Sequence, residues 1–98
     1  MFMRIINVRH RGLRRFIERD DESGLPQPFA EKVRNIVSFL QDMAAVDELK
    51  SMPLWRVHRL SGYQRVRWSL TVSRNWRITF AIHEKEGEIT DLDFEDYH

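Results

Sequence analysis

The sequence contains no cysteine, which excludes a disulfide framework and a thiolate metal site and is typical of a reducing compartment. It also contains no apolar run close to the ~20 residues that a membrane-spanning helix requires. Residues 1–10 lack the charged-then-apolar order and the small-residue cleavage site of a secretory signal. We therefore expect a cytoplasmic protein with no membrane association.

Familiar catalytic motifs are missing as well. There is no glycine-rich phosphate-binding loop and no serine, histidine and aspartate pattern that indicates nucleophilic hydrolysis. The four histidines stand at no metal-ligand spacing. Near the C-terminus Asp91, Asp93 and Glu95 share a strand parity, and we expect them to form an exposed edge of like charges rather than a Mg²⁺ site. The sequence therefore predicts neither a metal nor a cofactor.

Acidic residues are absent from the stretch 53–80, which holds six arginines, three tryptophans and one histidine. The net charge of the chain is nevertheless only +1, because seven acids lie between Glu84 and Asp96. Charge is thus segregated along the sequence, and an uncompensated positive surface attracts polyanions. Besides Arg77, the arginines predicted to contact phosphate are Arg56, Arg59, Arg65, Arg67 and Arg74.

Apolar and polar residues alternate on both sides of a short break at residues 73–75, as in an antiparallel hairpin with one buried face. The opposite parity carries Arg67 and Arg77, which we expect to extend from the sheet toward a ligand. The predicted inward-facing residues are Trp68, Leu70, Val72, Trp76, Ile78, Phe80 and Ile82.

The first half of the chain predicts a short strand and two helices. The apolar run 5–8 predicts the strand, and the spacing at 13–17 predicts a helix that ends in the charged run 19–24, finished by glycine. Pro28 suits the first turn of a second helix, whose apolar stripe extends over 29–44.

The second half predicts strands only. Its elements are a connector over 47–53, a strand over 54–60, a turn over 61–64, the hairpin, a polar turn over 84–87 and a last strand over 89–94. The order β-α-α-β-β-β-β predicts an α+β fold, with two N-terminal helices packed on a small antiparallel sheet. A chain of 98 residues that is 42% hydrophobic suffices for a single domain over 1–98 with one core.

Two residues of the basic stretch are candidates for chemistry. Arg77 either covers Trp76 with its stem or presents a guanidinium, fixed on a rigid strand, to a phosphate. The arginines nearby and the lack of acids favour the second interpretation. His58, which also stands among arginines, is either a structural hydrogen-bonding residue or a general base.

The last three residues, Asp96, Tyr97 and His98, allow two interpretations. They are either a frayed end or, because the strand before them is apolar, a docked end that brings a carboxylate, a phenol and an imidazole together. Residue chemistry alone leaves both open.

The order of these blocks resembles the HigB (plasmid maintenance system killer) toxins of the RelE superfamily. The resemblance extends from about Asn7 to the last residue. It is carried by Arg-Val-His-x-Leu-x-Gly at 56–62, Arg-Trp-Ser-Leu-x-Val at 67–72, Asn-Trp-Arg-Ile-x-Phe at 75–80 and the terminal Asp-Tyr-His.

The resemblance implies a RelE-like microbial RNase fold and a metal-independent endoribonuclease that cuts mRNA in the ribosomal A site during translation. It implies a HigA-like helix-turn-helix antitoxin as partner, with operator DNA bound only through the toxin–antitoxin complex. By position it assigns the catalytic histidine to His58, the phosphate-binding arginine to Arg77, and the C-terminal acid, tyrosine and histidine to Asp96, Tyr97 and His98.

One position departs from the family pattern, because Ser61 stands where the family commonly has lysine. Either Arg59 or Arg65 supplies the positive charge instead, or cleavage is weaker. Three alternative functions follow: a nucleic-acid-binding or antitoxin-binding protein without turnover, a toxin with another target such as a topoisomerase, and a purely structural subunit. Which of His58 and His98 is the base stays open.

Overall fold

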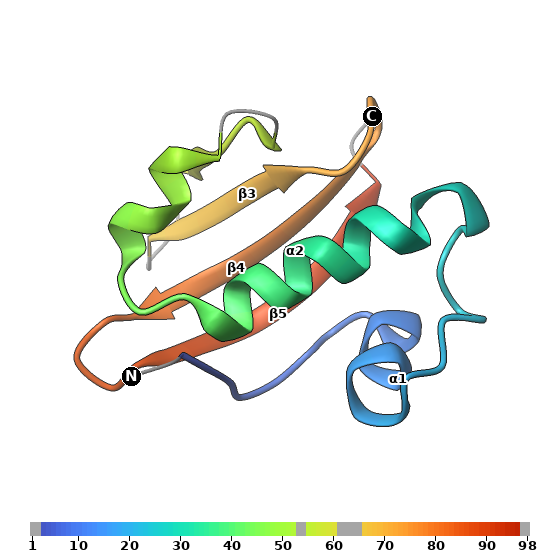
Figure 1. Cartoon of the computed structure of the whole chain (residues 1–98), viewed down its shortest axis with the longest axis horizontal. Helices are drawn as coiled ribbons and strands as arrows, with labels where there is room; N and C mark the ends of the chain where they lie inside the picture. The colour runs from blue at the N-terminus through green and yellow to red at the C-terminus, as the bar shows by residue number, and fades with distance from the viewer. Residues whose placement is uncertain (1–2, 53–54, 61–65, 97–98) are drawn as a thin grey trace.

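In the computed structural model, which describes residues 3–52, 55–60 and 66–96, a five-stranded sheet is covered on one face by a long helix, α2 (Figure 1). The sheet order is β1-β5-β4-β3-β2, and only the β1–β5 pair among these described strands is parallel. The expected α+β class and element order are confirmed, with two 3-10 helices (η) in addition. The elements are β1 Arg4–Ile5, α1 Arg11–Arg19, η1 Gln27–Phe29, α2 Ala30–Asp42, η2 Val46–Ser51, β2 His58–Leu60, β3 Arg67–Thr71, β4 Trp76–His83 and β5 Glu88–Asp96.

The predicted hairpin is β3 and β4, with Leu70 opposite Ile78 and Trp68 opposite Phe80. Leu70, Ile78 and Phe80 are completely buried, because every second residue of each strand faces α2. The helix contributes its own stripe to the same core. Its fully enclosed members are Val33, Ile36 and Leu40.

The second helix begins as expected and ends earlier. Pro28 lies in η1, immediately before α2, where its missing N–H costs no hydrogen bond. The helix ends at Asp42, and the segment expected to be a connector contains η2. Glu48 accounts for this difference, because its carboxylate accepts hydrogen bonds from the backbone N–H groups of Ala44 and Ala45 at 2.6 and 2.8 Å. A carboxylate that caps the first turn in this way stabilises a short helix.

The first helix ends at Arg19, within the charged run where the sequence predicts its end, and Asp20 is its C-cap. Asp20 adopts a left-handed conformation, with φ 55°, and its N–H closes the last turn on Phe16 O. Gly24 has a different role: it packs against Gly12 of α1. A Cβ atom on Gly12 would lie 2.2 Å from Gly24 O, so the two backbones touch only because both residues are glycine.

Two predicted strands are shorter than expected. The N-terminal strand covers only Arg4–Ile5, followed by a separate bridge from Val8 to Leu92. Strand β2 begins at His58 rather than at residue 54, because Arg56 has φ 44° and so leaves the extended region. Leu54 lies outside the described residues.

A β-bulge in β5 explains an irregular hydrophobic pattern. Ile89 and Leu92 are both fully buried although they are three residues apart, which contradicts a period of two. The pairing shifts by one residue between Thr79 and Ala81, and Asp91 has φ 53°. The extra residue switches the alternation and returns Leu92 to the core face.

None of the described helices combines the length and apolar character needed to cross a membrane.

Candidate active site

The sheet register places His58 and Arg77 on the same face, opposite to α2. His58 pairs with Ser69, while Arg77 pairs with Thr71 two residues further along β3. The side chains of directly paired residues in antiparallel strands point to the same face of the sheet. With strands ~4.8 Å apart and ~3.4 Å per residue, the Cα atoms of His58 and Arg77 lie roughly 12 Å apart. The helix-free face therefore carries both an exposed imidazole and a partly exposed guanidinium.

The turn between β3 and β4 holds the guanidinium of Arg77. Its Nη1 donates to the backbone oxygens of Ser73 at 2.8 Å and of Trp76 at 3.1 Å. The side chain is partly exposed. Because its position is fixed by backbone carbonyls, this guanidinium is suited to bind a phosphate with little loss of side-chain entropy.

Arg67 does not extend away from the sheet as the alternation suggested. Its side chain is 13% exposed and lies along the helix-free face. Nη2 donates to Thr79 Oγ1 at 3.1 Å and to Asp91 O at 3.2 Å, and Nη1 lies 4.0 Å from Asp91 Oδ2. Arg67 thus connects β3, β4 and β5, and its assignment to phosphate binding stays a prediction.

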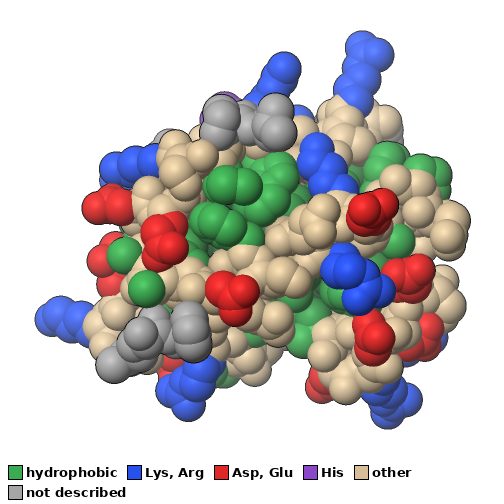
Figure 2. Space-filling model, in the orientation of Figure 1, with side chains coloured by type: hydrophobic (Ala, Val, Ile, Leu, Met, Phe, Trp, Pro, Cys, Tyr) green, Lys and Arg blue, Asp and Glu red, His purple; other side chains and the backbone are tan. Residues whose placement is uncertain are grey.

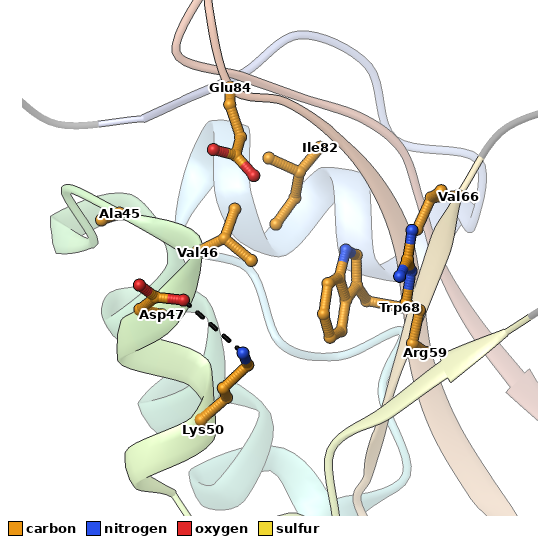
Figure 3. Close-up of a pocket in the computed structure, with 9 residues that line it drawn as sticks. All are labelled: Ala45, Val46, Asp47, Lys50, Arg59, Val66, Trp68, Ile82 and Glu84. Carbon is orange, nitrogen blue, oxygen red and sulfur yellow. Dashed lines mark ion pairs between the residues drawn. The ribbon is translucent and has the colours of Figure 1, made fainter.

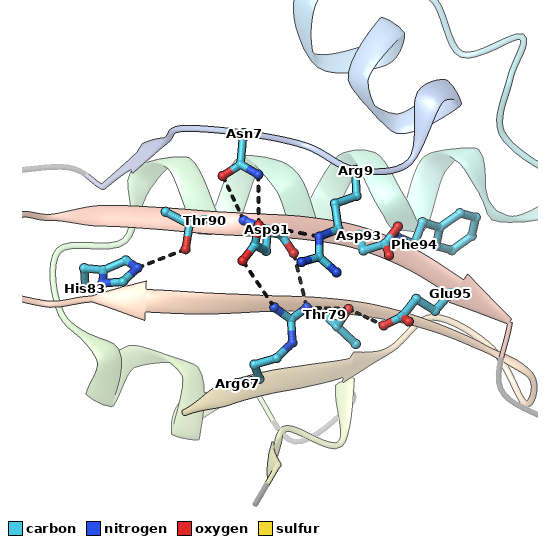
Figure 4. Close-up of polar contacts among 10 residues, drawn as sticks. All are labelled: Asn7, Arg9, Arg67, Thr79, His83, Thr90, Asp91, Asp93, Phe94 and Glu95. Atoms are coloured by element: carbon cyan, nitrogen blue, oxygen red, sulfur yellow. Dashed lines mark hydrogen bonds and ion pairs between the residues drawn. The ribbon is translucent and has the colours of Figure 1, made fainter. Parts of the chain in front are cut away.

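Asp91 is the centre of a polar network that joins the N-terminal segment to the sheet (Figure 4). Asn7 bonds both its carboxylate and its backbone N–H, and Arg9 Nε lies 3.5 Å from Oδ1. The expectation of an exposed edge of like charges is therefore wrong. Strand β5 lies between β1 and β4, and its bulge directs Asp91 to these cationic and amide partners.

Glu95 and Thr79 were not predicted as part of the site. Glu95 is the cross-strand partner of Arg77 and lies on the same face. Its carboxylate accepts a hydrogen bond from the hydroxyl of Thr79, which is fully buried and accepts in turn from Arg67. No local sequence pattern predicts that Glu95, Thr79 and Arg67 meet, because the pairing of β4 with β5 depends on the bulge.

The C-terminal residues are only partly described. Asp96 is exposed and pairs with Trp76, so the register directs it to the face opposite to Arg77 and Glu95. Tyr97 and His98 lie outside the described residues. The expected grouping of Asp96 with these two residues stays a prediction.

The other predicted arginines occupy different surroundings. Arg56 and Arg74 are exposed, Arg74 in the turn next to Arg77. Arg59 pairs with Trp68 and therefore lies on the helix side of β2, away from the His58 face. Arg65, like Ser61, lies outside the described residues.

His10 has a structural role. Its Nδ1 accepts a hydrogen bond from the N–H of Leu13 at 3.0 Å and so caps the first turn of α1. Burial lowers the pKa of His10 below its ordinary value, and the negative charge of Asp93 opposes this shift. The ring also meets the ring of Phe94 edge-on at 5.4 Å. Within the described ranges, no three or more His, Asp or Glu side chains are grouped so that they could hold a metal ion.

Comparisons with known proteins identify similar sequences. The family model described as the RelE-like toxin of type II toxin-antitoxin system HigB matches residues 6–98. A curated protein from Proteus vulgaris, Endoribonuclease HigB, is 31% identical over 94 residues, which cover 96% of this chain and 99% of that protein.

Proposed function

The chain belongs to the HigB-like family of RelE-like toxins of type II toxin–antitoxin systems, and from this membership we propose that it is a ribosome-dependent endoribonuclease that cleaves mRNA during translation. Its proposed partner is a HigA-like helix-turn-helix antitoxin, and operator DNA is bound only through the complex of the two proteins. This substrate places its action in the cytoplasm. The observation that supports the activity best is the position of His58 and Arg77 on one helix-free face.

The proposed reaction is attack by the RNA's own 2′-hydroxyl on the adjacent phosphorus. A base, His58 or His98, takes the 2′-hydroxyl proton while the new 2′-O–P bond forms and the P–O5′ bond breaks. An acid returns a proton to the departing 5′-oxygen, leaving a cyclic phosphate and a 5′-hydroxyl. Tyr97 orients the nucleotide or assists the proton transfers. General acid–base help of this kind is worth ~10²–10⁴-fold.

Arg77 has the largest electrostatic role in this scheme. Negative charge builds on the non-bridging oxygens as the phosphorane forms, and a fixed guanidinium stabilises it without reorganising. Arg77 is already held by the turn carbonyls, so it is pre-organised for this role. The exposed Arg74 next to it extends the positive surface along the RNA backbone. Holding the mRNA in line for attack is left to the ribosome.

Mapping new mRNA 5′ ends after induced expression tests the proposal. Wild type is expected to generate them, whereas Arg77→Ala and a chain truncated before Tyr97 generate at least 100-fold fewer, a loss of the size expected for a charge-stabilising group. Arg14→Ala is the matched control, because Arg14 is exposed on α1, away from this face. Thermal melts of each variant separate loss of chemistry from loss of fold, since Arg77 also bonds the turn.

Two results would point to other functions. Ribosome binding without new 5′ ends in wild type would indicate a binding protein without turnover. Toxicity that persists in Arg77→Ala, with intact mRNA, would indicate a toxin with a different target.

A further inference from the structure

A groove lies between η2 and the helix side of β2, β3 and β4, on the face opposite to His58 and Arg77 (Figure 3). It consists of two adjoining cavities of about 390 and about 470 Å³. Both cavities are lined by Lys50, Arg59 and Trp68. The groove is thus continuous and is separate from the proposed active site.

The floor of the groove is apolar. Val46 comes from η2, Trp68 from β3 and Ile82 from β4, and their side chains point toward one another in Figure 3. Val66 also lines the groove, next to Trp68, and is 42% exposed. In the described part of the chain, Val66 and Ile6 are the only large hydrophobic residues that are exposed. Figure 2 shows hydrophobic side chains gathered on the face that carries α2 and η2. An apolar floor that is half-buried at Trp68 and Ile82, next to the exposed Val66, is typical of a binding surface.

The rim of the groove carries charges of both signs. Arg59 and Lys50 are balanced by Asp47 and Glu84. Arg59 makes no ion pair with another described residue, and Lys50 makes only a 3.7 Å contact with Asp47, both side chains being highly exposed. A surface with two cations and two anions gives no net attraction for RNA, whereas alternating charges around an apolar centre are typical of protein interfaces.

We propose that this groove is the docking surface for the HigA-like antitoxin; the identity of the partner rests on the proposed function. The occupant is a segment of the antitoxin that places apolar side chains over Trp68 and Val66. A carboxylate of that segment faces Arg59, and a cation faces Glu84. This arrangement gives Arg59 and Glu84 partners of opposite charge and covers the apolar floor.

Binding of the purified cognate HigA-like protein to purified toxin, measured by calorimetry, tests this proposal. Val66→Asp places a charge on the apolar wall and is expected to weaken binding at least tenfold. Ile6→Asp is the matched control, because Ile6 is 49% exposed and does not line the groove. Ile6→Asp is expected to bind as wild type does, and both variants should retain the cleavage activity of wild type, since neither residue belongs to the proposed active site.

A charge swap gives a second measurement. Glu84→Lys should weaken binding, and a compensating acidic substitution in the antitoxin should restore it, a rescue that general damage to the fold would not produce. Fluorescence adds a local signal: antitoxin binding should change the emission of wild type more than that of Trp68→Phe.

Several outcomes would overturn the proposal. Equal affinity of Val66→Asp and wild type would place the antitoxin elsewhere, as would equal losses in Val66→Asp and Ile6→Asp. Val66-dependent dimerisation of the toxin alone would assign the groove to a second copy, and quenching by a short RNA that depends on Trp68 would assign it to nucleic acid. Because the binding assay does not depend on cleavage, an inactive toxin that still binds through Val66 would refute the proposed activity and leave this inference standing.

Discussion

Asn7 and Asp91 exchange two hydrogen bonds although 84 residues separate them in sequence: Asn7 Nδ2 donates to Asp91 Oδ1 at 3.0 Å, and the backbone N–H of Asp91 donates to Asn7 Oδ1 at 3.0 Å. These bonds stabilise the left-handed conformation of Asp91 in the β5 bulge. They also hold the N-terminal segment against the sheet, beyond the two residues of β1.

Asn7→Ala should therefore lower the free energy of unfolding by about 1–2 kcal/mol, because two hydrogen bonds are lost and the bulge is no longer secured. Asn35→Ala is the control, since Asn35 is exposed on α2 and its replacement by alanine should leave stability unchanged or slightly raised. Urea denaturation measures both. Equal stability of Asn7→Ala and wild type would show that the backbone pairing alone holds the bulge.

Stability should depend on pH through His10. Burial lowers its pKa below the ordinary value of 6.5, so as the pH falls below 6.5 the unfolded chain takes up a proton before the folded one does. Its contribution to stability is thus complete above pH 6.5 and is lost progressively below it. His10→Asn keeps an oxygen acceptor for Leu13 N–H but does not titrate. Urea titrations at pH 7.5 and 5.5 should show a smaller difference for His10→Asn, and an undiminished difference would exclude His10 as its source.

Gly12→Ala should destabilise the protein, although alanine normally stabilises a helix interior by about 1 kcal/mol relative to glycine. The new Cβ would meet Gly24 O at 2.2 Å, which forces α1 and the following loop apart. We expect a loss of about 1–3 kcal/mol, the usual cost of overpacking. Glu18→Ala, at an exposed position of the same helix, should have little effect. A melting temperature of Gly12→Ala at or above wild type would contradict the close contact.

Arg67 and Thr79 should be energetically coupled. Arg67→Ala removes the donor to Thr79 and the contacts with Asp91, while Thr79→Val removes the acceptor from a fully buried position. In a double-mutant cycle the coupling free energy should be about 0.5–3 kcal/mol, the range for residues of one hydrogen-bonded network. The same cycle with Arg74, which is exposed in the neighbouring turn, should give a value near zero. Strictly additive effects of Arg67→Ala and Thr79→Val would show that their contact contributes nothing to stability.

Much of the candidate site follows from local pattern. The alternation around residues 73–75 predicts which parity of β3 and β4 is buried, and from it follows that Arg77 lies on the face opposite to the core. The resemblance to HigB toxins points to the same residue by an independent route. The assignments of Tyr97, His98 and Arg65 to the site remain predictions, since these residues lie outside the described ranges.

Patterns among neighbouring residues are enough to predict the apolar stripe of α2, the β3–β4 hairpin and the order of helices and strands. Only the folded chain shows the parallel pairing of β1 with β5, the bulge at Asp91, the position of Arg67 along the helix-free face and that of Glu95 beside Arg77. The physical reason is the range of the interactions. The periods of strands and helices, two and 3.6 residues, can be recognised from adjacent residues. The pairing register between segments up to 84 residues apart depends on which segments come into contact when the protein folds.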